Sequence, residues 1–229
     1  MSALRAYRIF NEDGKVVSRF VDLRLEELDP GEVVVKVAYS SVNYKDALAA
    51  TGAGRIIRRF PCVGGIDLSG TVVESSSPGF KKGDAVIATS YDLGVAHDGG
   101  YAEYCRVPSA WVVAMPRGLD LFEAMALGTA GFTAGLAVDR MEHDGLKPAN
   151  GPVIVTGATG GVGSIAVDVL AGAGYQVVPP TCMVLAIQDS TSPPRLSTAP
   201  AHVALSNGLI LVRSRLLRSM ISLAPSFFR

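Results

Sequence analysis

The chain has 229 residues, of which 48% are hydrophobic and 18% charged, so it can bury a core and lacks the composition of a disordered protein. Its 21 Lys and Arg residues balance 21 Asp and Glu residues, which excludes a general electrostatic attraction to nucleic acid or to an anionic membrane. Three cysteines, Cys62, Cys105 and Cys182, lie far apart, and their spacing predicts neither a disulfide framework nor a zinc knuckle.

The N-terminal stretch MSALRAYRIFNEDG lacks the apolar core of a signal peptide, because Glu12 and Asp13 fall where that core would continue. The sequence contains no run of about 18 uncharged apolar residues, the length that a membrane-spanning helix needs. We therefore expect a cytoplasmic protein whose partners include neither a membrane nor nucleic acid.

The first half of the chain is rich in short β-like runs separated by turn signals. The runs are LRAYRIF (4–10), EVVVKVAYSSVN (32–43), GTVVES (70–75), GDAVIAT (83–89) and AEYCRVPSAWVVAM (102–115). Asp13-Gly14, Asp29-Pro30-Gly31 and Lys82-Gly83-Asp84 are typical of the turns between strands. This pattern predicts an all-β module, a compact barrel, in residues 1–119.

The period of the hydrophobic residues changes at Asp120, a plausible N-cap for the helical pattern LDLFEAMALGTAGFTAGLAVDRME. A strand (153–156), a glycine turn, a helix (164–173) and a second strand (175–178) are predicted to follow. Together they make one βαβ unit, the opening of a doubly wound sheet, in residues 120–178.

The turn in this unit has glycines at positions 157, 160 and 163, with Gly161 between the last two. Such a turn lets backbone amides approach a pyrophosphate at the positive end of the following helix. The spacing G-x-x-G-x-x-G departs from the commoner G-x-G-x-x-G, and a tight packing turn is the alternative interpretation. Residues 177–182 contain neither an acid for an adenosine ribose nor a base for a 2′-phosphate.

The composition shifts abruptly after Val178. Residues 1–178 carry a net charge of −4, whereas residues 179–229 carry +4 with a single acid, Asp189, and hold six of the 13 prolines. A Pro- and Ser-rich stretch separates the two strand-like runs MVLAI and LILV, and it is longer than a usual αβ connection. We expect this tail to be aberrant or poorly ordered, and not to complete the sheet.

Five stretches resemble, in the right order, the zinc-free quinone-oxidoreductase branch of the medium-chain dehydrogenase/reductase superfamily, and most closely the group that contains acryloyl-CoA reductase. They are SSVNYKDALAATG (40–52), PCVGGIDLSGTVVES (61–75), DGGYAEYCRVP (98–108), LGTAGFTAGLAV (127–138) and VTGATGGVGSIAVDVLAGAGYQVV (155–178). The resemblance implies an α/β protein with a β-rich GroES-like barrel domain followed by a Rossmann domain. That second domain is truncated here, because the resemblance ends at Val178. Full-length relatives are expected to be homodimers.

The resemblance also bears on metal. Zinc-dependent relatives have a Cys ligand where this chain reads Asn43-Tyr44-Lys45-Asp46, and a Gly-His-Glu where it reads Gly65-Ile66-Asp67. Ile66 has no lone pair to offer a metal. We expect no catalytic zinc.

By resemblance, Asn43 and Tyr44 line the substrate pocket beside the nicotinamide, with Tyr44 the leading hydrogen-bond and proton donor and Lys45 and Asp46 placed to orient it. The alternative for Tyr44 is a core or rim aromatic at the end of a strand. Asp67 is the third candidate catalytic residue, either as an orienting group or merely as a turn cap. The expected cofactor-binding residues are Asn43, Thr129, Ala130, Gly157, Thr159, Gly160, Gly161, Val162 and Gly163.

Three other stretches have competing interpretations. Gly128-Thr129-Ala130-Gly131 could simply be a small-residue helix interface, and residues 98–100 are expected to be only a turn. The arginines at positions 55, 58 and 59 are expected to form a mobile basic patch, solvated or in contact with coenzyme A phosphates.

The expected function is reduction of an α,β-unsaturated acyl-CoA, such as acryloyl-CoA, by NADPH. A quinone or enone reductase with the same cofactor is the rival enzyme. A non-catalytic remnant, in which the β-rich module folds and the cofactor half does not, is the rival outside the enzyme class. We expect the chain as written to be a poor enzyme, because the phosphate-reading loop and the nicotinamide half of the family are not recognisable after residue 178.

Overall fold

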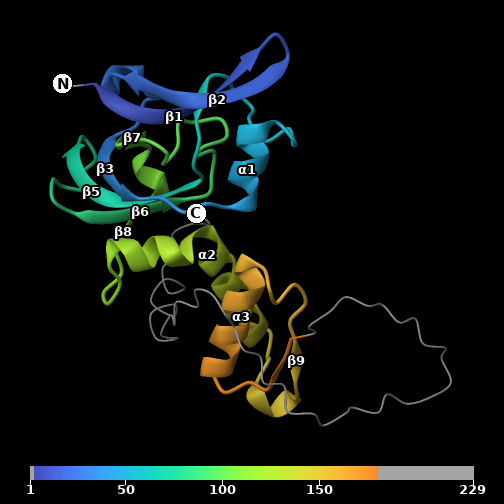
Figure 1. Ribbon diagram of the computed structural model, residues 1–229. Coiled ribbons are helices and arrows are strands. Elements are labelled where there is room, and N and C mark those ends of the chain that lie inside the picture. Colours follow the sequence, from blue (N-terminus) through green and yellow to red (C-terminus); the bar gives the residue numbers. More distant parts are fainter. Residues whose placement is uncertain (1–2, 180–229) are drawn as a thin grey trace.

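The computed structural model describes residues 3–179, which form a β-rich front region followed by an α/β unit (Figure 1). The front region contains two antiparallel sheets. One has the order β2-β1-β4 and the other β7-β3-β5-β6-β8. Their strands are β1 (Leu4–Glu12), β2 (Lys15–Leu23), β3 (Val33–Tyr39), β4 (Cys62–Val63), β5 (Asp67–Ser75), β6 (Ala85–Thr89), β7 (Tyr104–Val107) and β8 (Val112–Ala114).

Every β-like run predicted from the sequence overlaps at least one of these strands, so the β-rich assignment is confirmed. The all-β part of that prediction is wrong, because α1 (Tyr44–Thr51) interrupts the module. The helix begins where Asn43 N–H donates to the Asp46 carboxylate at 2.8 Å, and it ends at Gly52 in the left-handed region (φ 71°). Strand β2 was also not predicted, and short 3-10 turns occur at Leu25–Glu27, Ser109–Trp111 and Pro148–Asn150.

The core of the front region lies between and beneath the sheets. Alternate residues of β3 and β5 point to one side and are fully buried, as the two-residue period of a strand requires. The buried cluster there is Val33, Val35, Leu68, Val72, Val86, Ala88, Leu93, Cys105, Val107 and Val112. This packing fixes the register of β5 and therefore the position of Asp67 at its first residue.

The second region begins with α2 (Leu121–His143). Its N-cap is Asp120, as predicted from the sequence. Asp120 Oδ1 accepts the Glu123 N–H at 2.7 Å, and Glu123 returns a bond to the Asp120 N–H at 3.0 Å. The βαβ unit follows as β9 (Val153–Ile154), α3 (Gly161–Gly172) and β10 (Val177–Val178), with the two strands parallel. The predicted unit is thus confirmed, although both strands are shorter than expected.

Helix α2 joins the two regions, since it lies under the five-stranded sheet and against α3 (Figure 1). One buried cluster contains Ile87 of β6, Leu127 and Val138 of α2, and Leu170 of α3. By length and composition α2 is the one helix among residues 3–179 that could cross a membrane. It nevertheless packs as a core helix and is broken at Gly128.

The predicted tail, residues 179–229, lies outside the described residues except for Pro179, and so does the prediction that the tail does not complete the sheet.

Candidate cofactor and substrate site

Asp67 is the centre of the candidate site, because its fully buried carboxylate gathers donors from two distant segments. Oδ2 accepts from the Asn43 side-chain amide and from the Thr129 backbone N–H, both at 2.9 Å, and also from the Ser41 hydroxyl. Oδ1 accepts from the Thr129 hydroxyl. A carboxylate buried to this degree is stable only with such partners. Asp67 therefore does more than cap a local turn, because it joins the Ser41 and Asn43 side chains to Thr129 of α2.

The break in α2 explains how Thr129 reaches this carboxylate. Gly128 has φ 49° and ψ −154°, so Thr129 begins a new helical segment and directs its N–H away from the preceding turn. A Cβ at Gly128 would lie 2.8 Å from Ser41 Oγ and 2.9 Å from Asp67 Oδ2. Only glycine fits both the backbone conformation and the close approach.

Asn43 and Tyr44 lie at the start of α1, and their surroundings differ. The Asn43 amide is held by Asp67 and contacts Ser41 Oγ at 3.0 Å, whereas the Tyr44 side chain is 79% exposed. Tyr44 therefore lies at the surface, which excludes the core part of its alternative interpretation and agrees with the rim part. Its open ring is available to a substrate, while Lys45 beside it is also exposed.

Asp46 holds the start of α1 from inside the molecule. Its carboxylate accepts the Asn43 N–H at 2.8 Å and the Ile66 N–H at 3.1 Å. Burial raises the pKa of Asp46 above its ordinary value, against the opposing effect of those hydrogen bonds. Asp46 therefore fixes the backbone of Asn43 and Ile66, and its orienting role toward Tyr44 stays a prediction.

The glycine turn lies at the N-terminus of α3. Gly157 has φ 64°, and its carbonyl accepts the Gly160 N–H at 2.9 Å. A Cβ at Gly163 would lie 2.1 Å from the Gly157 oxygen, so Gly163 allows the helix to pack tightly on the turn. Five of the predicted cofactor-binding residues in this turn are exposed: Gly157, Thr159, Gly160, Gly161 and Val162.

The structure brings the predicted cofactor segments together. Ala130 follows Thr129 in α2, and a Cβ at Gly161 would meet the Ala130 Cβ at 3.4 Å. Hydrogen bonds thus join Asn43 to Asp67 and Asp67 to Thr129, and the next residue, Ala130, lies close to Gly161 of the glycine turn. Ala130 thus meets α3, as the helix-interface interpretation of residues 128–131 expects, and their place near the nicotinamide stays a prediction.

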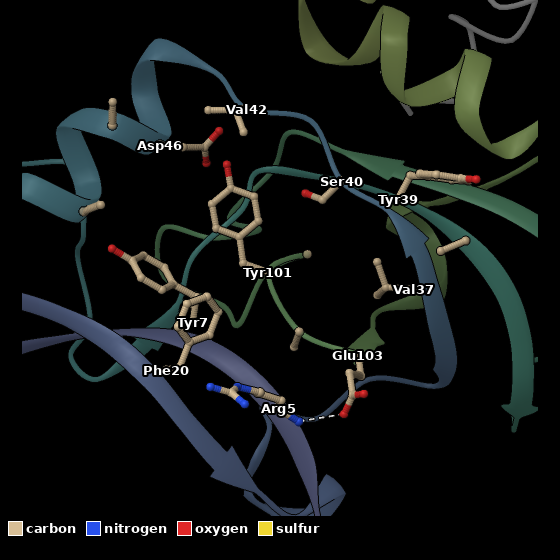
Figure 2. A pocket seen from close by; sticks show the side chains of 15 residues that line it. Arg5, Tyr7, Phe20, Val37, Tyr39, Ser40, Val42, Asp46, Tyr101 and Glu103 are labelled. Atoms are coloured by element: carbon tan, nitrogen blue, oxygen red, sulfur yellow. Dashed lines mark hydrogen bonds between the residues drawn. The ribbon is translucent and has the colours of Figure 1, made fainter.

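A cavity lies elsewhere, between α1, β3 and the β1–β2 hairpin (Figure 2). Its volume is about 680 Å³, and its walls include Tyr7, Phe20, Tyr39, Ser40, Val42, Asp46 and Tyr101. Asn43, Tyr44, Thr129 and the glycine turn do not line it. We place the candidate site on the Asp67 side, where chemically competent groups converge, and not in this cavity.

Tyr101 supports the site from the cavity side. Its hydroxyl donates to the Ser41 carbonyl at 3.1 Å and lies beside Asp46 (Figure 2). Burial, and next the nearby Asp46 carboxylate, raise the pKa of Tyr101 well above its usual value, so the hydroxyl keeps its proton. Sequence reasoning missed this residue and Ser41, since neither type nor spacing marks them. The glycine within an otherwise continuous helical pattern was the available signal for the break in α2.

The structure refines two expectations about nearby segments. Arg58 is paired with Asp92, and Arg59 is paired with Asp29 and bonds to the carbonyls of Ala96 and Pro61 at 3.1 Å, so these two arginines are not unpaired, while the Arg58 side chain remains solvated. Residues 98–100 are more than a turn. Asp98 is 1% exposed and accepts the backbone N–H groups of Val63 and Asp29, because three loops meet there.

Within residues 3–179 no group of three or more His, Cys, Asp or Glu side chains is placed to hold a metal ion. The side chain in the histidine position, Ile66, is 5% exposed. That the protein needs no zinc stays a prediction, which elemental analysis would test.

Residues 29–117 match the family model described as the alcohol dehydrogenase GroES-like domain. The chain is 51% identical over 166 residues to the acrylyl-CoA reductase AcuI of Ruegeria pomeroyi, covering 72% of this chain and 50% of that protein. It is 56% identical over 156 residues to YhfP of Bacillus subtilis, named as a quinone oxidoreductase, covering 68% and 47%. The structure of the yhdH oxidoreductase from Salmonella enterica in complex with NADP matches with a TM-score of 0.75 and 48% identity, covering 76% and 54%. The chain thus spans about half the length of these relatives.

Proposed function

Because the chain belongs to the medium-chain dehydrogenase/reductase family, we propose that it is built for the NADPH-dependent reduction of an α,β-unsaturated acyl-CoA such as acryloyl-CoA. The observation that carries this proposal is the junction at Asp67. There the Asn43 amide and Thr129 share one carboxylate, and Ala130 lies close to Gly161 of the glycine turn, although these segments are far apart in the sequence.

The residues present fit a dinucleotide. The exposed turn from Thr159 to Val162 opens directly into the N-terminus of α3, where backbone N–H groups and the helix dipole favour a pyrophosphate. Thr129 and Ala130 are half-buried beside it and would border the nicotinamide end. When bound, NADPH would supply a hydride for the β-carbon of the substrate.

The chain's own groups serve the other end of the reaction. Addition of a hydride to the β-carbon leaves charge on the thioester oxygen and an α-carbon that needs a proton. The Asn43 amide already donates to Asp67 and to Ser41, so it holds this segment in place, whereas the exposed Tyr44 hydroxyl can donate a hydrogen bond and a proton to the substrate. The proton reaches the α-carbon, and the phenolate recovers one from water. Full-length relatives would act as homodimers.

Binding of NADPH is the first test, because it separates an enzyme from a remnant. Cofactor fluorescence should change when the protein is added, and a Gly163→Val variant, whose side chain would enter the turn, should abolish the change. Absence of any change with the unaltered protein would support the remnant instead.

A quinone acceptor is the second candidate, and the 56% identity to YhfP favours it. NADPH oxidation should be compared with acryloyl-CoA and with benzoquinone at equal concentrations. Faster turnover with the thioester is expected, and a Tyr44→Phe variant should lose most of it. Oxidation by benzoquinone alone would replace the proposed substrate class.

A further inference from the structure

We propose that Asp67 is a positioning residue that couples the segment of Asn43 and Tyr44, proposed to bind substrate, to the segment that begins at Thr129, proposed to bind the cofactor. Asp67 does not itself touch substrate. The effect on NADPH rests on the proposed function, whereas the coupling of the two segments rests on the geometry alone. In this assignment one carboxylate fixes both the amide of Asn43 and the start of the helical segment at Thr129.

Burial excludes direct chemistry by Asp67. Asp67 is 0% exposed, and its carboxylate oxygens already accept hydrogen bonds from Ser41, Asn43 and Thr129. Four donors approach a group with about four acceptor positions, so little capacity remains for a fifth partner. A residue enclosed in this way acts through the groups it holds.

The helix break gives this carboxylate its second function. Thr129 offers its backbone N–H and its hydroxyl at the N-terminal end of the segment that continues to His143, and this is the arrangement of a helix N-cap. The cap comes from a strand 62 positions away in the sequence instead of from the preceding residue. The start of this helical segment is therefore hydrogen-bonded directly to the front sheet, so we expect the two to move together.

The segments that Asp67 holds reach both ends of the candidate site. Asn43 lies beside the exposed Tyr44, and Ala130 lies against Gly161 of the glycine turn. Loss of the Asp67 contacts would free the Asn43 amide and the start of the helical segment together. Coupled loosening of these two segments is the consequence that distinguishes a positioning residue from a merely buried one.

The test uses nuclear magnetic resonance of the full chain, with Asp67→Asn, Thr129→Val and the control Thr133→Val. The Thr133 hydroxyl bonds to the Thr129 carbonyl within its own helix and makes no contact with Asp67. Asp67→Asn and Thr129→Val should both shift the side-chain NH₂ resonances of Asn43, while Thr133→Val should leave them in place. Unshifted Asn43 resonances in Thr129→Val would overturn the coupling. If Asp67→Asn does not fold, Thr129→Val and Ser41→Ala carry the test.

NADPH affinity provides the second readout. Asp67→Asn and Thr129→Val should each weaken NADPH binding about tenfold, and the double variant should be no weaker than the poorer single variant, since both remove one shared unit. Thr129→Ser keeps the hydroxyl group and should therefore bind NADPH with the affinity of the unaltered chain. Additive losses, or no loss, would refute the positioning of the cofactor side. If the parent chain binds no NADPH, the proposed function fails, and the Asn43 resonances still decide the coupling.

Discussion

The front region and the βαβ unit are stabilised in different ways. In the front region, strands of up to nine residues pair over long sequence distances, and buried carboxylates such as Asp67 and Asp98 join its loops. In the βαβ unit the parallel strands β9 and β10 have two residues each, and the packing of α3 on α2 provides most of the contact. The comparison teaches that the front region is held by long-range strand pairing, whereas the βαβ unit depends on one helix interface.

The largest effect should come from enlarging the smaller region. A dinucleotide site lies between two halves of a doubly wound sheet, and residues 3–179 contain only two parallel strands. Replacing residues 179–229 with the corresponding half of the Ruegeria relative should tighten NADPH binding by about two to six decades, since two or three charge-assisted contacts are added. Fluorescence titration of both chains measures this, with acryloyl-CoA turnover beside it. Equal affinity and turnover would show that the βαβ unit suffices.

Thiol reactivity should show how firmly the front region is closed. Burial raises the pKa of Cys62 to about 12, and burial also raises the pKa of Cys105. In a Cys182→Ser background at pH 8, labelling of the native protein should be about three orders of magnitude slower than labelling in urea, because the thiolate is the reacting form. Rapid labelling of the native chain would mean that the front region opens readily.

Two glycine substitutions compare the regions directly. A Cβ at Gly70 would lie 2.2 Å from the Lys36 oxygen in the five-stranded sheet, and one at Gly163 would lie 2.1 Å from the Gly157 oxygen. Gly70→Ala should lower the free energy of unfolding by about 2–4 kcal/mol, as monitored by the single tryptophan, Trp111, in the front region. Gly163→Ala should leave the Trp111 transition nearly unchanged while weakening NADPH binding.

The control for both is Gly79→Ala, because a Cβ there meets only Ser77 Oγ at 3.8 Å and should be tolerated. A Gly163→Ala variant that shifts the Trp111 transition as far as Gly70→Ala would show that the two regions unfold as one.

The smallest effect is expected at the start of the shared helix. Asp120→Ala removes the acceptor for the Glu123 N–H and should cost about 1 kcal/mol, whereas Asp120→Asn should cost much less. Urea unfolding followed by circular dichroism measures both. A loss of several kcal/mol would mean that this cap holds the interface between the regions and not only one helical turn.

Much of the architecture could be predicted from local patterns. The Asp120 cap, the strand-turn-helix around Gly157, and the β-like runs each depend on residues a few positions apart, and the structure confirms them. The family resemblance is likewise confirmed, because its motifs are contiguous in the sequence. Helix α1 was not predicted, because its eight residues come directly after the β-like run of residues 32–43.

The sequence by itself therefore determined the β-rich front, the order of the βαβ unit, the glycine turn and the family resemblance. Only the tertiary structure decided that α2 breaks at Gly128, that Arg58 and Arg59 are paired with acids, and that Asp67 joins Asn43 to Thr129. The physical reason is the range of the interactions. Caps and turns are settled by neighbours along the chain, whereas a buried carboxylate takes its donors from whichever segments the packed core brings within about 3 Å.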